Sequence, residues 1–146
     1  MRRFSTSRSR RIGAQPARVM ELVRDSGSWP RWQSEIRTAR GPARLEAGDV
    51  VDGTAEMLGF GVHGRSTITQ ANDGRLEEDA IVGVSMKVTF VVEPHPNGAM
   101  VTHHMVADLP RGPLGSLLAF FLKRRLVRMQ RATLERLVDQ AEASDS

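Results

Sequence analysis

The sequence predicts a single α+β domain in which one antiparallel sheet packs against a long C-terminal helix. Short runs that alternate apolar and polar residues, separated by Gly, Pro, Asn and Asp, fill residues 35–109, which is typical of an antiparallel meander. A helical pattern then runs from Pro110 to about Ala143, long enough to cross a domain at about 1.5 Å per residue. The 146 residues, 40% of them hydrophobic, suffice for one core. We therefore expect one domain over residues 1–146, with a frayed polar tail over residues 142–146.

The N-terminal part of the chain predicts a strand followed by two short helices. An extended segment over residues 2–12 ends at Gly13, and Pro16 suits the first turn of a helix. A second short helix is expected at Trp29, Pro30, Arg31 and Trp32. Its two indoles are expected either to seal the core or to gate a portal into it.

Six strands are expected in the meander, and alternation defines their buried faces. The clearest strand covers residues 84–93, where every second side chain is apolar. The strand over residues 100–109 is expected to point His103 inward and His104 outward. Several inward positions over residues 60–68 are small, which leaves room for a cavity.

The C-terminal helix has two dissimilar halves. Residues 114–122 are apolar almost all round, whereas the second half mixes apolar and charged residues. A helix that is apolar on every side is buried or touches something apolar. The apolar half, followed by Lys123, Arg124 and Arg125, is either ordinary core beside a solvated face or a lid that meets an anionic membrane transiently.

Five stretches of sequence together carry a family resemblance. They are residues 14–23 (AQPARVMELV), 29–32 (WPRW), 72–76 (NDGRL), 100–104 (MVTHH) and 110–115 (PRGPLG). In this order the chain resembles, over nearly its whole length, the START-like or SRPBCC superfamily and its polyketide cyclase/dehydrase and lipid-transport group. The resemblance implies a helix-grip fold: a curved seven-stranded antiparallel sheet wrapped around a long C-terminal helix, with two short helices between strands 1 and 2. It also implies a cavity between sheet and helix.

Ligand binding in such a cavity would depend mainly on apolar burial, with His103 or Ser66 fixing the orientation of the ligand. Flexible methionines would adapt to an irregular ligand, and Trp29 and Trp32 would stand at the portal. The residues expected to line the cavity are Met57, Phe60, Val62, Ser66, Met86, Val88, Phe90, His103, Met105, Leu117, Leu118 and Phe121.

Two titratable residues could carry chemistry. An inward His103 could move protons near neutral pH, or it could simply hydrogen-bond a neighbouring strand or a buried water. Glu78 shares a face with Leu76 and Ala80, and a carboxyl buried there would have a raised pKa; the opposite phase of this strand stays open. The two strands are expected to be two positions apart, about 9–10 Å between backbones, so direct contact would need both side chains to lean together or a bridging water.

Composition excludes several classes of site. The absence of cysteine excludes disulfides, thiolate nucleophiles and cysteine-based zinc sites. The histidines lack a metal-ligand spacing, and no phosphate loop, dinucleotide fingerprint or Gly-flanked serine occurs, so neither metal nor cofactor is expected. The formal net charge of +4 could suggest nucleic acid, but Tyr is absent and no base-stacking motif is present, so no nucleic-acid partner is expected.

The N-terminus lacks the apolar stretch of a secretory signal. The longest apolar run, residues 117–122, is far shorter than the roughly 20 residues that span a bilayer. A cytoplasmic location is therefore expected, and the oligomeric state is left open.

Three functions remain open at this point. The leading one is binding or transport of a small hydrophobic, lipid-like or polyketide-like molecule. The first alternative is a polyketide cyclase/dehydrase-type enzyme that uses His103 with or without Glu78. The second is a protein-interaction or toxin-type module of the same fold, which a cavity too small for any ligand would favour.

Overall fold

The structure is a computed structural model that describes residues 2–57 and 59–143, without the side chains of Arg2 and Met57. Its elements follow the predicted order of strand, short helices, meander and long helix. They are β1 (Arg2–Ile12), α1 (Pro16–Val23), the 3-10 turn η1 (Ser26–Ser28), α2 (Trp29–Trp32), β2 (Ile36–Arg40), β3 (Val50–Met57), β4 (Phe60–Ala71), β5 (Arg75–Val82), β6 (Val84–His95), β7 (Gly98–Leu109) and α3 (Gly112–Ala143).

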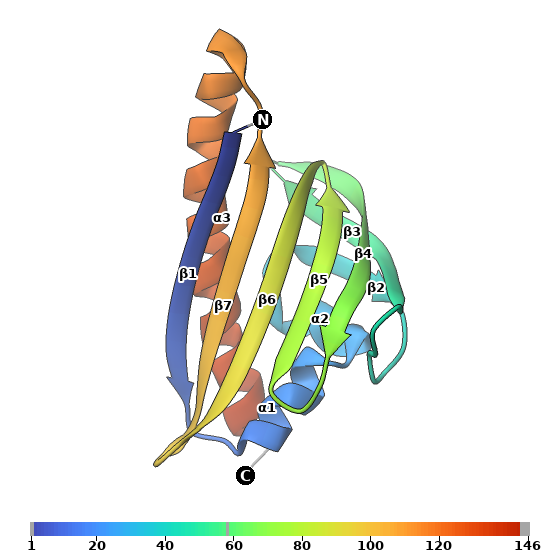
Figure 1. The fold of residues 1–146 in the computed structure, drawn as a ribbon, viewed down its shortest axis with the longest axis vertical. Coiled ribbons are helices and arrows are strands. Elements are labelled where there is room, and N and C mark those ends of the chain that lie inside the picture. Colours follow the sequence, from blue (N-terminus) through green and yellow to red (C-terminus); the bar gives the residue numbers. More distant parts are fainter. Residues whose placement is uncertain (1, 58, 144–146) are drawn as a thin grey trace.

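The strands form one antiparallel sheet in the order β1-β7-β6-β5-β4-β3-β2. The predicted seven-stranded curved sheet with its long C-terminal helix is therefore confirmed. The strand register shifts between Ile36 and Thr38 in β2 and between Ile68 and Gln70 in β4, and such bulges bend a strand and increase its twist. Accordingly β2 and β3 turn away from the plane of β5, β6 and β7 and enclose one side of the inner face (Figure 1).

Helix α3 closes the concave face of the sheet. It runs along β1 and β7 and also packs against α1 and α2 (Figure 1). Its second half supplies most of its core contacts, because Leu134, Leu137 and Ala141 are at most 1% exposed. Each fully buried leucine contributes about 1.5–3 kcal/mol to folding, so this half of the helix anchors the element to the sheet.

The first half of α3 differs from the expectation that it lines the cavity. Leu117, Leu118 and Phe121 are 58%, 41% and 51% exposed. The physical reason is the position of the helix start: α3 begins beyond the end of β7 and projects past the end of the sheet (Figure 1), so no strand lies over its first turns. Phe60 is 73% exposed for a related reason, since it is the first residue of β4 at the β3–β4 turn.

The tail expected to begin at Glu142 is partly helical. Glu142 and Ala143 belong to α3, and Oε2 of Glu142 accepts a hydrogen bond from the backbone N–H of Gly13 at 2.9 Å. This contact ties the last turn of the helix to the end of β1. Residues 144–146 lie outside the described part of the chain.

Candidate functional site: two adjoining cavities on the inner face of the sheet

Two adjoining cavities lie on the inner face of the sheet, with volumes of about 60 and 70 Å³. The first lies against β2–β5 and reaches Trp29 and Ser66. The second extends across β6 and β7 to α3, where Met129 and Thr133 contribute. Both share the lining residues Ile36, Ala55, Glu78, Ala80 and Val82.

Small residues create this space. The inner face carries Ala55 on β3, Gly64 and Ser66 on β4 and Ala80 on β5 at neighbouring positions. Their short side chains leave space between the sheet and residues 29–36, which we call the α2–β2 segment. The prediction that small inward positions around residues 60–68 leave room therefore agrees with the position of the first cavity.

The cavities are small in this conformation. A water molecule needs about 10–15 Å³ of such volume, so each cavity has room for several waters, whereas pockets for drug-sized ligands have roughly 300–1,000 Å³. A ligand of more than a few heavy atoms therefore requires the walls to move apart.

Glu78 brings a carboxyl group into both cavities. It is 6% exposed, and burial raises its pKa to about 7, an effect that the nearby hydroxyl of Ser66 partly offsets. The hydroxyl of Ser66 and the carboxyl of Glu78 are not hydrogen-bonded to each other. Oε2 of Glu78 and Oγ of Ser66 are both buried, and neither has a hydrogen-bond partner among the described residues. Buried polar atoms normally have partners, so these two are available to a bound polar group.

His103 enters the second cavity from β7, where the alternation of that strand predicted it would point inward. The side-chain amide of Gln130 on α3 donates to Nδ1 of His103 at 3.0 Å and to its main-chain carbonyl at 2.9 Å. Because Nδ1 accepts, the ring proton lies on Nε2. Phe90 packs edge-on against the ring at 4.6 Å between centroids.

The ring of His103 is neutral at physiological pH. Burial, with a smaller contribution from the charge of His104, lowers the pKa of His103 to about 3. Nε2 makes no hydrogen bond to a described residue. His103 therefore acts as a neutral hydrogen-bond donor, held in one orientation by Gln130.

Glu78 and His103 lie on strands two positions apart, with β6 between them. The register pairs Glu78 with Val88 and His103 with Phe90, so the two residues are also offset along the strands. No hydrogen bond joins their side chains. They line the second cavity as two separate polar groups with apolar surface between them.

A half-buried ion pair borders the second cavity and was not predicted from the sequence. Arg125 on α3 donates to Oε2 of Glu35 at 2.8 Å, and Ser34 donates to Oε1 at 3.3 Å. The Glu35 side chain is 10% exposed and that of Arg125 is 36% exposed. The pair connects α3 to the α2–β2 segment and thereby holds one wall of the cavity in place.

Some of the predicted lining residues line the cavities and others do not. Ser66, Met86, Val88, His103 and Met105 line the cavities, whereas Phe90 is buried beside them and Val62 is only partly buried. The exposed side chains of Phe60, Leu117, Leu118 and Phe121 line neither cavity, and the side chain of Met57 lies outside the described part of the chain.

The two indoles are buried in the core. Trp29 is 2% and Trp32 0% exposed. Nε1 of Trp29 donates to the carbonyl of Val23 at 3.0 Å, and Nε1 of Trp32 donates to Oγ of Ser28 at 2.9 Å. This arrangement corresponds to the core-sealing interpretation, and only Trp29 reaches a cavity wall.

The described residues contain no group of three or more His, Asp or Glu side chains arranged to hold a metal ion. Within the same residues, no helix is long and apolar enough to cross a membrane.

Comparisons with known proteins give one family. A family model described as "Polyketide cyclase / dehydrase and lipid transport" matches residues 3–142. A comparison with curated proteins found no match.

Solved structures share the fold at low sequence identity. The protein TTHA0849 from Thermus thermophilus superposes with a TM-score of 0.81 at 20% identity, covering 99% of this chain and 100% of that one. The di-domain ARO/CYC StfQ from the steffimycin biosynthetic pathway gives 0.80 at 12% identity, covering 98% of this chain and 52% of the two-domain chain. Ara h 8.0201 gives 0.70 at 10% identity, covering 97% and 99%. At these identities the likeness extends to the fold alone.

Proposed function

Because this chain belongs to the polyketide cyclase/dehydrase and lipid-transport family, we propose that it binds a small, mostly apolar molecule in the two adjoining cavities. The observation that carries the proposal is the pair of unpartnered buried oxygens, Glu78 Oε2 and Ser66 Oγ, in a mainly apolar enclosure. An unmatched buried polar group costs about 1–3 kcal/mol. A ligand that supplies the missing partner therefore gains more from this site than from an entirely apolar one.

The polar groups of the cavity favour a neutral ligand that bears acceptor oxygens. Ser66 can donate through its hydroxyl, His103 through Nε2–H, and Glu78 through its carboxyl while that group is protonated. With a pKa of about 7, Glu78 is mostly protonated below pH 7. A carbonyl, ether or ester oxygen on an apolar skeleton matches these three donors, whereas a carboxylate would meet the negative charge of Glu78 above pH 7.

Entry of such a ligand requires the cavity to widen, and the Arg125–Glu35 contact marks where this would occur. This pair and the 3.4 Å hydrogen bond from the backbone N–H of Ser34 to Oγ1 of Thr133 join α3 to the α2–β2 segment. Both contacts are partly exposed. Separation of α3 from this segment would widen the opening of the second cavity without breaking the ladder of the sheet.

The first experiment is native mass spectrometry of gently purified protein, followed by denaturing extraction of any bound molecule. The cavity-filling variant Ala80→Leu places a larger side chain in both cavities, and Ala47→Leu makes the same change at an exposed loop position. Retention of an apolar, oxygen-bearing molecule by the wild type and Ala47→Leu, but not by Ala80→Leu, is expected. Equal retention by all three proteins would contradict binding in the cavity, and an empty wild type would favour the protein-interaction alternative.

A second candidate function is proton transfer on an enolisable ketone, favoured by the pKa of Glu78 near neutrality. The ionised carboxylate would take a proton from the carbon next to the carbonyl, and Nε2–H of His103 would donate a hydrogen bond to the enolate oxygen that forms. His103 is a donor in this scheme and Glu78 the base, because the pKa of His103 is lowered to about 3.

Deuterium exchange into the methyl group of acetophenone tests this second function. The rate is expected to increase as the pH rises through about 7 and to be lost in Glu78→Gln, while Asp79→Asn on the opposite face of β5 keeps it. Exchange that is unaffected by Glu78→Gln would eliminate Glu78 as the base.

A further inference from the structure

The start of α3 presents five large apolar side chains to solvent. Leu114 is 84% exposed, and the exposed fractions of the others lie between 41% and 58%. We call this set the apolar helix end; its members are Leu114, Leu117, Leu118, Phe120 and Phe121. Within residues 112–122, only Ala119 and Leu122 are buried. An exposed apolar cluster of this kind marks an interaction site more often than a chance surface.

A basic segment follows directly on the same helix. Between residues 122 and 134 the chain has five Lys and Arg residues and no Asp or Glu. Phe121, Arg124, Arg125 and Arg128 line one surface depression of about 280 Å³, since their spacing of three to four residues places them on one face. We call Lys123, Arg124, Arg125, Arg128 and Arg131 the basic segment.

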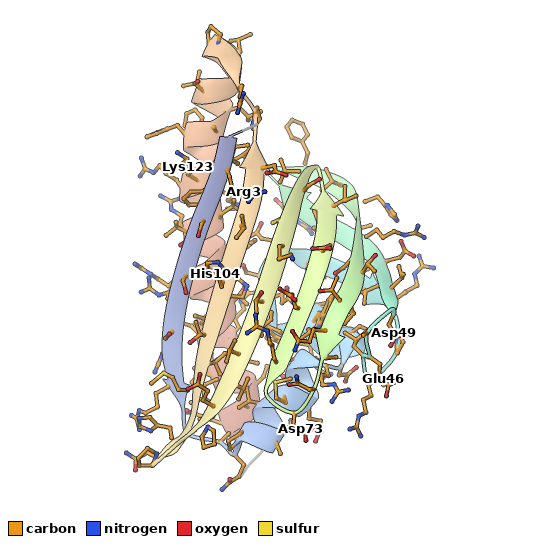
Figure 2. The ribbon with its side chains drawn as sticks, in the orientation of Figure 1. Arg3, Glu46, Asp49, Asp73, His104 and Lys123 are labelled. Carbon is orange, nitrogen blue, oxygen red and sulfur yellow. The ribbon has the colours of Figure 1, made fainter. Side chains whose placement is uncertain are left out.

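Other elements extend this surface at the same end of the sheet. β4 begins and β5 ends here, which brings the exposed Phe60 and Ile81, 73% and 64% exposed, to the end from which α3 projects. Lys123 and Arg3 also lie toward this end, whereas Asp73 lies at the opposite end (Figure 2). The molecule thus has one end that is both apolar and basic.

We propose that this end of the molecule docks on an anionic lipid bilayer. The apolar helix end would enter the boundary between headgroups and acyl chains, and the basic segment would contact lipid phosphates. From Leu114 to Phe121 the helix rises about 10 Å, which is comparable to the roughly 5–10 Å depth that apolar side chains of interfacial helices reach at the boundary between headgroups and acyl chains. Lys123 and Arg124 follow Phe121 within one turn, at the level where phosphates would lie.

The positive charges of the basic segment favour an anionic bilayer over a second copy of this chain as the partner of the apolar helix end. Apposition of two apolar helix ends would bring two basic segments together, and among the described residues only Arg125 of each segment has an acidic partner, Glu35. Like charges juxtaposed at an interface disfavour association. An anionic surface instead attracts each Lys and Arg close to it. The proposal does not depend on what the cavity binds.

Sedimentation with vesicles tests the proposal. Vesicles of phosphatidylcholine alone are compared with vesicles of equal parts phosphatidylcholine and phosphatidylserine, at low and high salt. Wild-type protein is expected to sediment with the anionic vesicles at low salt and to be released by high salt, because screening weakens the attraction.

Two variants with matched controls locate the surface. Arg124→Glu/Arg128→Glu is expected to bind anionic vesicles at least about tenfold more weakly, whereas Arg11→Glu/Arg40→Glu, at exposed positions of the other end of the sheet, keeps the wild-type affinity. Leu114→Ser/Leu117→Ser is expected to lose about tenfold through lost apolar burial, and Val50→Ser, an exposed apolar residue at the far end of the sheet, is its control.

Three outcomes would overturn the proposal. One is the absence of binding to anionic vesicles at low salt. Another is an equal loss of binding in the control variants. The third is a wild-type dimer in analytical ultracentrifugation that Leu114→Ser/Leu117→Ser abolishes, which would assign the apolar helix end to a second copy of this chain.

Discussion

Replacement of Glu78 by glutamine should remove a large pH dependence from the stability of the fold. The carboxyl has an ordinary pKa of 4.5 in the unfolded chain, and burial raises its pKa to about 7 in the folded one. Between these two pH values the folded chain keeps a proton that the unfolded chain has released. Stability from this group is therefore fully present below pH 4.5 and is lost as the pH rises to 7.

The magnitude follows from the size of the shift. One pKa unit corresponds to about 1.4 kcal/mol, so a rise from 4.5 to about 7 corresponds to about 3 kcal/mol. Glutamine cannot ionise, so the free energy of unfolding of Glu78→Gln minus that of wild type should rise by about 3 kcal/mol between pH 4.5 and pH 7.5. His103 has the opposite dependence, because its lowered pKa makes stability fall with decreasing pH, but both proteins contain His103 and its effect cancels in the difference.

The assay is urea unfolding followed by the fluorescence of Trp29 and Trp32, both of which are buried, at pH values from 4.5 to 8.5. Asp79→Asn, an exposed neighbour on the outer face of β5, is the control and should show no comparable change. A difference between Glu78→Gln and wild type that stays constant with pH, within about 0.5 kcal/mol, would refute the argument that burial controls this carboxyl.

Two further predictions concern contacts around the cavity, and a third concerns the turn between β6 and β7. Gln130→Leu should lower the free energy of unfolding by about 1–3 kcal/mol, since it leaves Nδ1 of His103 without its partner; a loss below about 0.5 kcal/mol in urea unfolding would contradict this. Arg125→Met should lower the free energy of unfolding by about 1–3 kcal/mol, because Glu35 keeps a largely buried charge without its partner. Addition of Glu35→Gln should restore part of this loss in urea unfolding. A double variant that is less stable than Arg125→Met would contradict the argument that the unpaired charge of Glu35 causes the loss. Gly98→Ala should cost at least about 2 kcal/mol, because a Cβ there would meet a backbone carbonyl and φ is +136°; an unchanged melting temperature would contradict the strain.

The fold could be predicted because its signals are local and repeated. Alternation over residues 84–93 and 100–109 defines the inner face of β6 and β7 without any tertiary information, and it correctly points His103 inward. The same argument, applied to the neighbouring residues Leu76 and Ala80, favoured an inward Glu78, and the structure buries it.

The position of the cavity could be predicted only in part, because it depends on where elements end in space. The sequence pattern cannot show that α3 begins beyond the edge of the sheet, and Leu117 and Phe121 were therefore expected to be internal. Glu35 had no local signal, since its burial depends on Arg125, which lies 90 residues further along the chain. Gln130 was likewise indistinguishable from a surface residue of an amphipathic helix until its contacts with His103 were known.

The most direct test of cavity binding is a methyl NMR titration with acetophenone and its oxygen-free counterpart cumene. Met86, Met105 and Met129 line the second cavity, whereas Met20 and Met100 lie outside both cavities, so ¹³C-labelled methionine methyls report where a ligand sits. We expect intermolecular NOEs from acetophenone to the three cavity methyls only, with binding that weakens as the pH rises through about 7 and a weaker, pH-independent binding of cumene. NOEs to Met20 or Met100 with none to the cavity methyls, or no binding of either compound at any pH, would contradict the claim that this fold holds an apolar ligand between its sheet and α3.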